Sequence, residues 1–405
     1  MKSDPDDNNE NLKIAVISDL HAQSSEGYKE GISFLHSGLS HSSGEDPISA
    51  LKSLITTDKL QADVVLCPGD LADKASPDGV NYAWHKLQEI AAWLGADFLA
   101  ATAGNHDVDS RYQHNDHDAK GMLQGLEPHF PVGDLRKCDQ YWARNFVTYE
   151  DDRLRLLILN SSAYHGENDE FRHGRISGRT QEALKKEIAN CEQRPINILL
   201  CHHHPQRFSS LTEEDYSEMR GGDSLVKILE NSKSNWLVVH GHQHFPNIFY
   251  ASGSSLAPII FGAGSFSACL YPELQTRARN QFYILEFPIL SPVSAFSSIK
   301  GYFKAWDYIW NIGWRPAREN SGLPHNGGFG WKGDFPDLAE RVESYLRTDG
   351  NAYIVWSKLT AQMPELRHML PNDLNRFIHL LEENMGVHVL RDKHGAPEQV
   401  GFPDE

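Results

Sequence analysis

The stretch Lys13-Ile14-Ala15-Val16-Ile17-Ser18-Asp19-Leu20-His21 decides the fold, because a short apolar run ends directly in an Asp-x-His pair. A nearly continuous apolar run of this length is typical of a strand that is covered on both faces. The carboxylate of Asp19 and the imidazole of His21 then follow the carboxyl end of that strand. The same arrangement recurs in the rest of the chain.

Four more polar clusters follow predicted strands in the same way. They are Gly69-Asp70 after 63–66, Gly104-Asn105-His106-Asp107 after 98–102, His202-His203-His204 after 196–200, and Gly241-His242-Gln243-His244 after 236–239. An Asp-x-His triplet alone arises by chance roughly once in such a chain. The evidence for a shared site is therefore that five such polar clusters occur together, each after a predicted strand. Loops at the carboxyl ends of strands converge in an open α/β sheet, and ligands bind there. We expect the five segments to share one cleft.

Helical spacing of apolar residues between these strands makes the fold class α/β. The predicted helices cover 47–59, 79–94, 177–189 and 224–231, and another strand covers 154–159. The later runs 257–262 and 281–287 have no helix between them, which predicts an antiparallel part of the sheet. The alternating aromatic residues of 301–314 predict a hairpin at the edge of the core.

The chain divides into three parts by composition. Residues 1–11 are acidic and polar and are expected to form a disordered tail, and residues 12–315 are expected to form the main domain. After Pro316 the chain becomes rich in glycine and asparagine, and amphipathic helical sequence follows at 336–347 and 373–384. We expect a small C-terminal α+β domain over 316–405, for which a helix followed by a hairpin suggests a winged-helix-like module. This domain is a candidate for gating substrate, oligomerising or binding a protein partner.

The composition disfavours several classes of partner. The formal charge is −17 at pH 7, which repels polyanions, so nucleic acid is a less favoured partner without being excluded. No window reaches the roughly 20 uncharged apolar residues that span a bilayer, so no membrane association is expected. The five widely spaced cysteines and the absence of a secretory signal from the polar first residues favour a reduced, cytoplasmic compartment.

The side chains in the five clusters are those that transition metals prefer. Imidazole nitrogen and carboxylate oxygen suit zinc, manganese and iron(II), whereas magnesium and calcium prefer sites made only of oxygen. Each of these Asp, Asn and His residues alone is more simply interpreted as a helix cap, a turn residue or a buried histidine. The full set, however, is costly to bury without a cation. One carboxylate that serves two ions must bridge them, and ions about 3.5–4 Å apart bind both the attacking and the leaving oxygen of an in-line displacement.

With these motifs in this order, the sequence resembles the calcineurin-like metallophosphoesterase superfamily over about residues 12 to 290. The matching motifs are Asp19-Leu20-His21, Gly69-Asp70, Gly104-Asn105-His106-Asp107, His203-His204-Pro205 and Gly241-His242-Gln243-His244. Their compact spacing is most similar to the branch that contains cyclic-nucleotide phosphodiesterases. The resemblance implies a four-layer α/β/β/α sandwich and two divalent ions, which would be manganese, iron or zinc.

The resemblance also implies a role for each motif residue. One metal would be held by Asp19, His21, Asp70 and His244, and the other by Asp70, Asn105, His203 and His242. His106 resembles the histidine that contacts the substrate phosphate and assists the leaving group, and Asp107 is expected to orient its ring. In the triplet His202-His203-His204 the motif spacing favours His203 as the ligand, while strand register leaves His202 as the alternative.

The expected reaction is metal-dependent hydrolysis of a P–O ester bond by a hydroxide shared between the metals. The first expectation for the substrate is a small phosphodiester such as a cyclic nucleotide. Nuclease activity, phosphomonoesterase activity and a non-catalytic metal-binding interaction module are the alternatives. The intact ligand set argues against the last of these.

Overall fold

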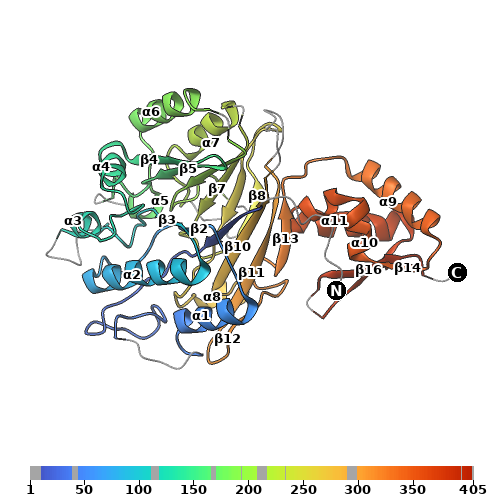
Figure 1. The fold of residues 1–405 in the computed structure, drawn as a ribbon, viewed down its shortest axis with the longest axis horizontal. Coiled ribbons are helices and arrows are strands. Elements are labelled where there is room, and N and C mark those ends of the chain that lie inside the picture. Colours follow the sequence, from blue (N-terminus) through green and yellow to red (C-terminus); the bar gives the residue numbers. More distant parts are fainter. Residues whose placement is uncertain are drawn as a thin grey trace.

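The computed structural model describes residues 11–38, 44–110, 118–165, 170–192, 194–207, 217–232, 234–289, 299–393 and 395–403. Two large sheets with flanking helices form the main domain, and a smaller module follows it toward the C-terminus (Figure 1). The tail predicted for 1–11 lies outside the described residues, except for Asn11, which begins the first strand.

The first large sheet has β1 at its centre, antiparallel to β10 on one side and parallel to β2 on the other. Its strand order is β12-β11-β10-β1-β2-β3, with β13 also paired to β11. The strands are β1 (Asn11–Val16), β2 (Val64–Cys67), β3 (Phe98–Ala101), β10 (Gln281–Pro288), β11 (Gly301–Ile309), β12 (Gly313–Pro316) and β13 (Asn326–Phe329). The predicted hairpin of 301–314 is therefore present as β11 and β12, which pair antiparallel.

The second large sheet has the order β4-β5-β6-β7-β9-β8. The inner strands run parallel and the edge strands β4 and β8 run antiparallel. The strands are β4 (Phe146–Glu150), β5 (Leu154–Leu159), β6 (Ile196–Leu200), β7 (Trp236–His240), β8 (Asn247–Tyr250) and β9 (Ile259–Gly262). The prediction of antiparallel strands holds for β10, whereas β9 is parallel to β7 and antiparallel only to β8.

Helices cover the outer faces of both sheets, which gives the four-layer sandwich. They are α1 (Pro47–Asp58), α2 (Pro77–Leu94), α3 (Ala119–Gln124), α4 (Leu135–Arg144), α5 (Glu170–His173), α6 (Gly178–Ala189), α7 (Gly222–Asn231) and α8 (Pro272–Gln275). Alternate residues of β5 show why its sequence is apolar throughout. Leu156 and Ile158 join the main core that both sheets share with α1 and α2, while Leu157 joins the cluster under α6 and α7.

Capping residues define the ends of α1 and α2. Asp46 caps α1 by accepting hydrogen bonds from the backbone N–H groups of Ile48 and Ser49, and Pro47 occupies the first turn. Ser76 caps α2 in the same way, and Gly95 ends α2 in a left-handed conformation. Both helices therefore begin directly after the loops that follow β1 and β2.

The C-terminal module has its own hydrophobic core, built from residues between Leu338 and Val400. Its elements are α9 (Phe335–Asp349), β14 (Tyr353–Val355), α10 (Trp356–Gln362), the 3₁₀ helix η1 (Pro364–His368), α11 (Pro371–Met385), β15 (His388–Arg391) and β16 (Pro397–Gly401). The three strands form one sheet with β16 in the middle.

The predicted boundary at residue 316 differs from the structure. Residues 326–329 form β13, which pairs with β11 in the main sheet, and the side chain of Phe329 is fully buried in the main core. The glycine-rich composition of this stretch reflects close packing rather than a linker, because a side chain at Gly328 would collide with the backbone of η1. The main domain therefore extends to about residue 330.

Among the described residues, no helix combines the length and the apolar character needed to cross a membrane.

Candidate metal centre

Backbone hydrogen bonds hold the five predicted segments against one another. The N–H of Asp19 donates to Gly69 O at 3.0 Å, and the N–H of His21 donates to Asp70 O at 3.0 Å. On the other sheet, the N–H of Gly241 donates to His202 O at 3.1 Å. The N–H of His242 then donates to Asp19 Oδ1 at 3.1 Å, which joins the loops of the two sheets. The structure thus brings the segments together where the sequence predicts a shared cleft.

Asp19, His21, Asp70 and His244 form a first group of four converging donor atoms. The Nε2 atoms of His21 and His244 lie 3.0 Å apart. Asp19 Oδ1 lies 3.4 Å from His244 Nε2, and Asp70 Oδ2 lies 3.5 Å from His21 Nε2. These are the residues that the resemblance assigns to one metal.

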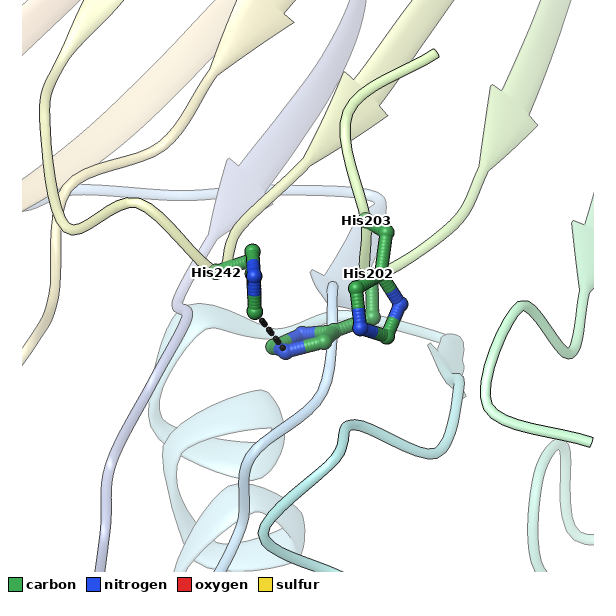
Figure 2. A group of neighbouring side chains, drawn as sticks. All are labelled: His202, His203 and His242. Atoms are coloured by element: carbon green, nitrogen blue, oxygen red, sulfur yellow. Dashed lines mark hydrogen bonds between the residues drawn. The ribbon is translucent and has the colours of Figure 1, made fainter. Parts of the chain in front are cut away.

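Asp70, Asn105, His202 and His242 form a second group. Asn105 Oδ1 lies 2.9 Å from both His202 Nε2 and His242 Nδ1. His202 Nε2 lies 3.3 Å from His242 Nδ1, the contact drawn in Figure 2, and 3.3 Å from Asp70 Oδ2. The same oxygen, Asp70 Oδ2, therefore belongs to both groups.

These spacings fit a pair of metal ions. Donor atoms held about 2.0–2.2 Å from one zinc-type ion lie roughly 3–3.6 Å from each other. The donor-atom distances quoted for the two groups run from 2.9 to 3.5 Å, close to this spacing, and the groups combine imidazole nitrogens with carboxylate and amide oxygens. The ligand atoms of Asp19, His21 and His244 lie within 4.8 Å of one another, as do those of Asp19, Asp70 and His202. Ligand atoms of His203 come equally close to His202 and His242, and those of His106 to His21 and Asp70, so the direction in which these two rings point has to separate them from the groups.

His202, rather than His203, makes the contacts that the motif spacing predicts for the ligand. The ring of His203 points its Nδ1 to the hydroxyl of Ser161 at 2.9 Å, and its buried Nε2 has no hydrogen-bond partner. Figure 2 shows His203 beside the other two rings, and its centroid lies 4.4 Å from that of His242. The assignment at this triplet therefore moves to His202, because its Nε2 faces both Asp70 and Asn105.

His106 lies at the edge of the centre and outside the two groups. Its side chain is 35% exposed, whereas those of His21 and His202 are 5% and 0% exposed, so it is more accessible than these neighbours. Its Nδ1 lies 3.0 Å from Asp73 Oδ1, and its ring centroid is 4.6 Å from that of His21. The ring is therefore accessible from outside the two groups of donor atoms.

Asp73, rather than Asp107, orients the His106 ring. Asp107 is fully buried and accepts the N–H groups of Ala72 at 3.0 Å and Gly104 at 2.8 Å, so it ties the second loop to the third. The prediction for Asp107 was therefore wrong about its partner. The signal in the sequence for Asp73 is its position three residues after Asp70, and the cap of α2, the helix that follows, is Ser76.

Five of the residues in the two groups have a strained backbone. Asp19, His21, Asp70, His242 and His244 have φ between 47° and 73°, the left-handed region that residues other than glycine rarely adopt. Such conformations cost about 1–3 kcal/mol each and concentrate at functional sites. This clustering is independent of the donor distances and supports the same location.

Two glycines allow the loops to approach the carboxylates. A Cβ atom on Gly104 would lie 2.1 Å from Asp70 Oδ1, and a Cβ atom on Gly241 would lie 2.3 Å from Asp19 Oδ2. Neither carboxylate has room to move away, because both are buried. The glycines of the motifs are thus required by packing.

Burial and neighbouring charges shift the pKa values of the histidines in the centre. Burial lowers the pKa of His21 to about 3, and the neighbouring His106 adds to this effect. Burial also disfavours the charged form of His202, but the Asp70 carboxylate outweighs it and raises the pKa of His202 to about 9. A metal ligand must be neutral imidazole, so a divalent ion would replace the proton that Asp70 otherwise stabilises.

A family model described as calcineurin-like phosphoesterase matches residues 12–246, which is more than half of the chain. The chain belongs to the calcineurin-like phosphoesterase family. A second model, described as wHTH-Calcineurin_assc, matches residues 327–383 of this family member.

Individual relatives of this calcineurin-like chain are distant. A cAMP/cGMP dual specificity phosphodiesterase of Mycobacterium tuberculosis is 26% identical over 203 residues, which are 50% of this chain and 54% of the relative. The match thus spans about half the length of that protein. A dimetal phosphatase from Danio rerio has 10% identity and a TM-score of 0.49, with 74% of this chain and 96% of that chain covered. A purple acid phosphatase from yellow lupin has 13% identity and a TM-score of 0.47, with 80% and 54% covered.

Proposed function

We propose that the protein is a dinuclear metal-dependent phosphodiesterase that hydrolyses a small phosphodiester, with a cyclic nucleotide as the first candidate. The observation that carries this proposal is the sharing of Asp70 Oδ2 between the two groups of donor atoms. A single oxygen that belongs to both groups would hold two ions close enough to act on one phosphate.

In this proposal Asp19, His21, Asp70 and His244 hold one ion, and Asp70, Asn105, His202 and His242 hold the other. The two ions, when bound, supply positive charge to the phosphate and activate water for attack. Manganese, iron and zinc all suit this mixture of nitrogen and oxygen donors.

His106 is the proposed general acid. Its Nδ1 faces the Asp73 carboxylate, so Nε2 is the nitrogen available to a substrate. The carboxylates of Asp70 and Asp73 outweigh burial and raise the pKa of His106, which favours the protonated ring. The ring can then deliver a proton to the departing oxygen, and Asp73 holds its orientation.

The choice of substrate rests on two observations. The relative from Mycobacterium tuberculosis is a cAMP/cGMP phosphodiesterase, and its similarity covers 203 residues. The charge of −17 gives little help in binding a long polyanion, which places DNA and RNA below small diesters.

For the C-terminal module we propose a winged-helix-like fold that contacts a protein, either a partner or a second copy of the chain. The family model over 327–383 and the order of helices and strands support the fold. The charges on α11 argue against nucleic acid, since Arg376 is accompanied by Asp373, Glu382 and Glu383. A cytoplasmic location remains part of the proposal.

A substrate screen tests the function. The purified protein, reconstituted with manganese, zinc or iron, would be offered phosphomonoesters, aryl diesters, cyclic nucleotides, and single- and double-stranded nucleic acid. We expect two bound ions per chain and the highest kcat/KM on a small diester. Higher turnover of nucleic acid or of monoesters would replace the substrate class, and two bound ions without any turnover would favour a non-catalytic role.

A further inference from the structure

Ser18 lies directly before the proposed ligand Asp19, and its side chain belongs to neither group of donor atoms. The side chain is fully buried, and its hydroxyl donates to Asp19 Oδ2 at 2.5 Å. A serine hydroxyl has a single hydrogen, which this bond uses. Ser18 therefore acts on one defined oxygen of the Asp19 carboxylate.

The two oxygens of Asp19 have different surroundings. Oδ1 faces the first group, 3.4 Å from His244 Nε2 and 3.9 Å from His21 Nε2. Oδ2 accepts the Ser18 hydroxyl. The N–H of His242 lies 3.1 Å from Oδ1 and 3.3 Å from Oδ2, on the protein side of the carboxylate. In this arrangement Asp19 offers Oδ1 to an ion, while Ser18 occupies Oδ2.

The backbone around this contact is fixed without the help of the Ser18 side chain. The N–H of Phe266 donates to Ser18 O at 2.7 Å, and the Ser265 hydroxyl donates to Asp19 O at 2.7 Å. Gly241 covers the contact, because a Cβ atom there would lie 2.3 Å from both Ser18 Oγ and Asp19 Oδ2. Loss of the Ser18 hydroxyl should therefore free the carboxylate and leave the loop in place.

We propose that Ser18 is a positioning residue that keeps Asp19 as a one-oxygen ligand and thereby sets the affinity of the first group for its ion. This inference rests on the proposed function, since it concerns one of the two ions proposed there. Without the hydroxyl, the carboxylate can rotate or bind an ion through both oxygens. Partners that orient a ligand contribute about 10–100-fold to metal affinity.

Calorimetric titration of the metal-free protein with manganese tests this role. Ser18→Ala should weaken the binding of one ion by about 10–100-fold and leave the other unchanged, because no ligand of the second group except the shared Asp70 belongs to the first group. His202→Ala identifies the affected ion, since that variant should retain only the ion of the first group. Adding Ser18→Ala to His202→Ala should weaken the remaining ion by the same factor.

Ser267→Ala is the matched control. The Ser267 side chain is also fully buried, and its hydroxyl donates to the backbone oxygen of Leu20, the residue between Asp19 and His21, at 2.6 Å. Each variant loses one buried hydrogen bond in the same loop, so the melting temperatures of the two metal-free proteins should fall alike. Ser267→Ala should nevertheless bind both ions like the wild type.

Several results would overturn the positioning role: unchanged affinity in Ser18→Ala, weakening of both ions, or equal weakening in the two serine variants. A metal-free Ser18→Ala protein that does not fold would assign Ser18 to the fold and overturn it as well. If Ser18→Ala loses affinity for one ion but the wild type hydrolyses no diester, the proposed reaction fails while the positioning role stands. If the wild type hydrolyses diesters and Ser18→Ala binds both ions normally, the positioning role fails while the reaction stands.

Discussion

Asp70 connects the two halves of the metal centre at the scale of single residues. Its Oδ2 faces His21 on one side and His202 on the other, and its Oδ1 accepts the N–H of His106 at 2.7 Å. A neutral amide in this place would keep the shape and remove the charge that both ions share. The roles of its neighbours can be separated by the same kind of substitution.

Asp70→Asn is expected to lose both metals and activity together. Replacing a shared carboxylate should lower metal affinity by more than about 100-fold, beyond the 10–100-fold typical of residues that only orient ligands. Elemental analysis after gel filtration measures the bound metal. Asp73→Asn serves as the control and should retain both ions, whereas two tightly bound ions in Asp70→Asn would remove the bridge from the assignment.

His202→Ala and His203→Ala are expected to differ in metal content. Removal of the His202 imidazole takes a nitrogen from the second group, so one ion per chain should remain. His203→Ala leaves Asp70, Asn105 and His242 in place and should keep two ions, with a lower melting temperature because a buried side chain is lost. The opposite pattern of metal content would return the assignment to His203.

His106→Ala is expected to keep its metals and lose rate according to the leaving group. An alkoxide leaves slowly unless it is protonated, so kcat on a cyclic nucleotide should fall by about 10²–10⁴-fold. A nitrophenolate needs no proton, and its loss should be much smaller. Equal losses on both substrates would mean that His106 stabilises phosphate charge instead.

The sequence predicted which loops would meet at the centre, because an apolar strand followed by Asp, Asn or His is a strong local signal. The motif spacing favoured His203 over His202 as the ligand. The apolar pattern of β6 could not correct this choice, because the strand is buried on both faces and so does not show which way each following residue points. Leu200 packs into the main core and Cys201 packs under α6 and α7, a distinction that only the tertiary structure supplies. The pairing of Asp73 with His106 was not predicted either, since the two residues are distant in sequence.

At the scale of elements, the β8–β9 hairpin joins the metal loop to the C-terminal module. β8 begins three residues after His244, and the Tyr250 hydroxyl at its end accepts the N–H of Gly330 at 3.2 Å and donates to Trp331 O at 2.7 Å. Lys332 Nζ donates to the backbone oxygens of Ser255 and Ala257 at 2.8 and 3.0 Å. The segment entering the module is thus fastened to an element that starts at the site.

Tyr250→Phe is expected to loosen this attachment. Loss of the hydroxyl removes a donor and an acceptor at a partly buried position, which costs about 1 kcal/mol for each hydrogen bond. Amide hydrogen exchange at Gly330 should therefore become about 30-fold faster, the factor that corresponds to about 2 kcal/mol. Exchange in α6, on the far side of the second sheet, is the internal reference and should not change.

At the scale of the whole molecule, the chain consists of a large two-sheet domain and a module with a separate core. The composition of the sequence predicted a division near residue 316, and glycine-rich β13, which lies beyond that point, pairs with the main sheet. Strand signals depend on apolar side chains, and in β13 only Phe329 provides one. Pairing with β11, which the sequence does not encode locally, makes this stretch a strand.

Two truncations are expected to behave differently because of β13. A chain ending at Gly333 keeps Phe329 and should retain two metals and turnover of an aryl diester. A chain ending at Arg315 loses the burial of Phe329, a loss of about 3–5 kcal/mol for a phenylalanine side chain, which lowers the melting temperature by roughly 10 °C or more. Equal stability of the two truncations in thermal unfolding would restore the boundary near 316.

Gly104 and Gly241 lie against the carboxylates of Asp70 and Asp19. This close packing affects which substitutions the site would tolerate in a genetic screen. A survey of all single substitutions would rank these two glycines with the metal ligands, although neither offers an atom to a metal or to a substrate. Even alanine would push a carboxylate out of place. The set of intolerant positions would therefore outline the space that the ions need, and it would be larger than the set of residues that perform chemistry.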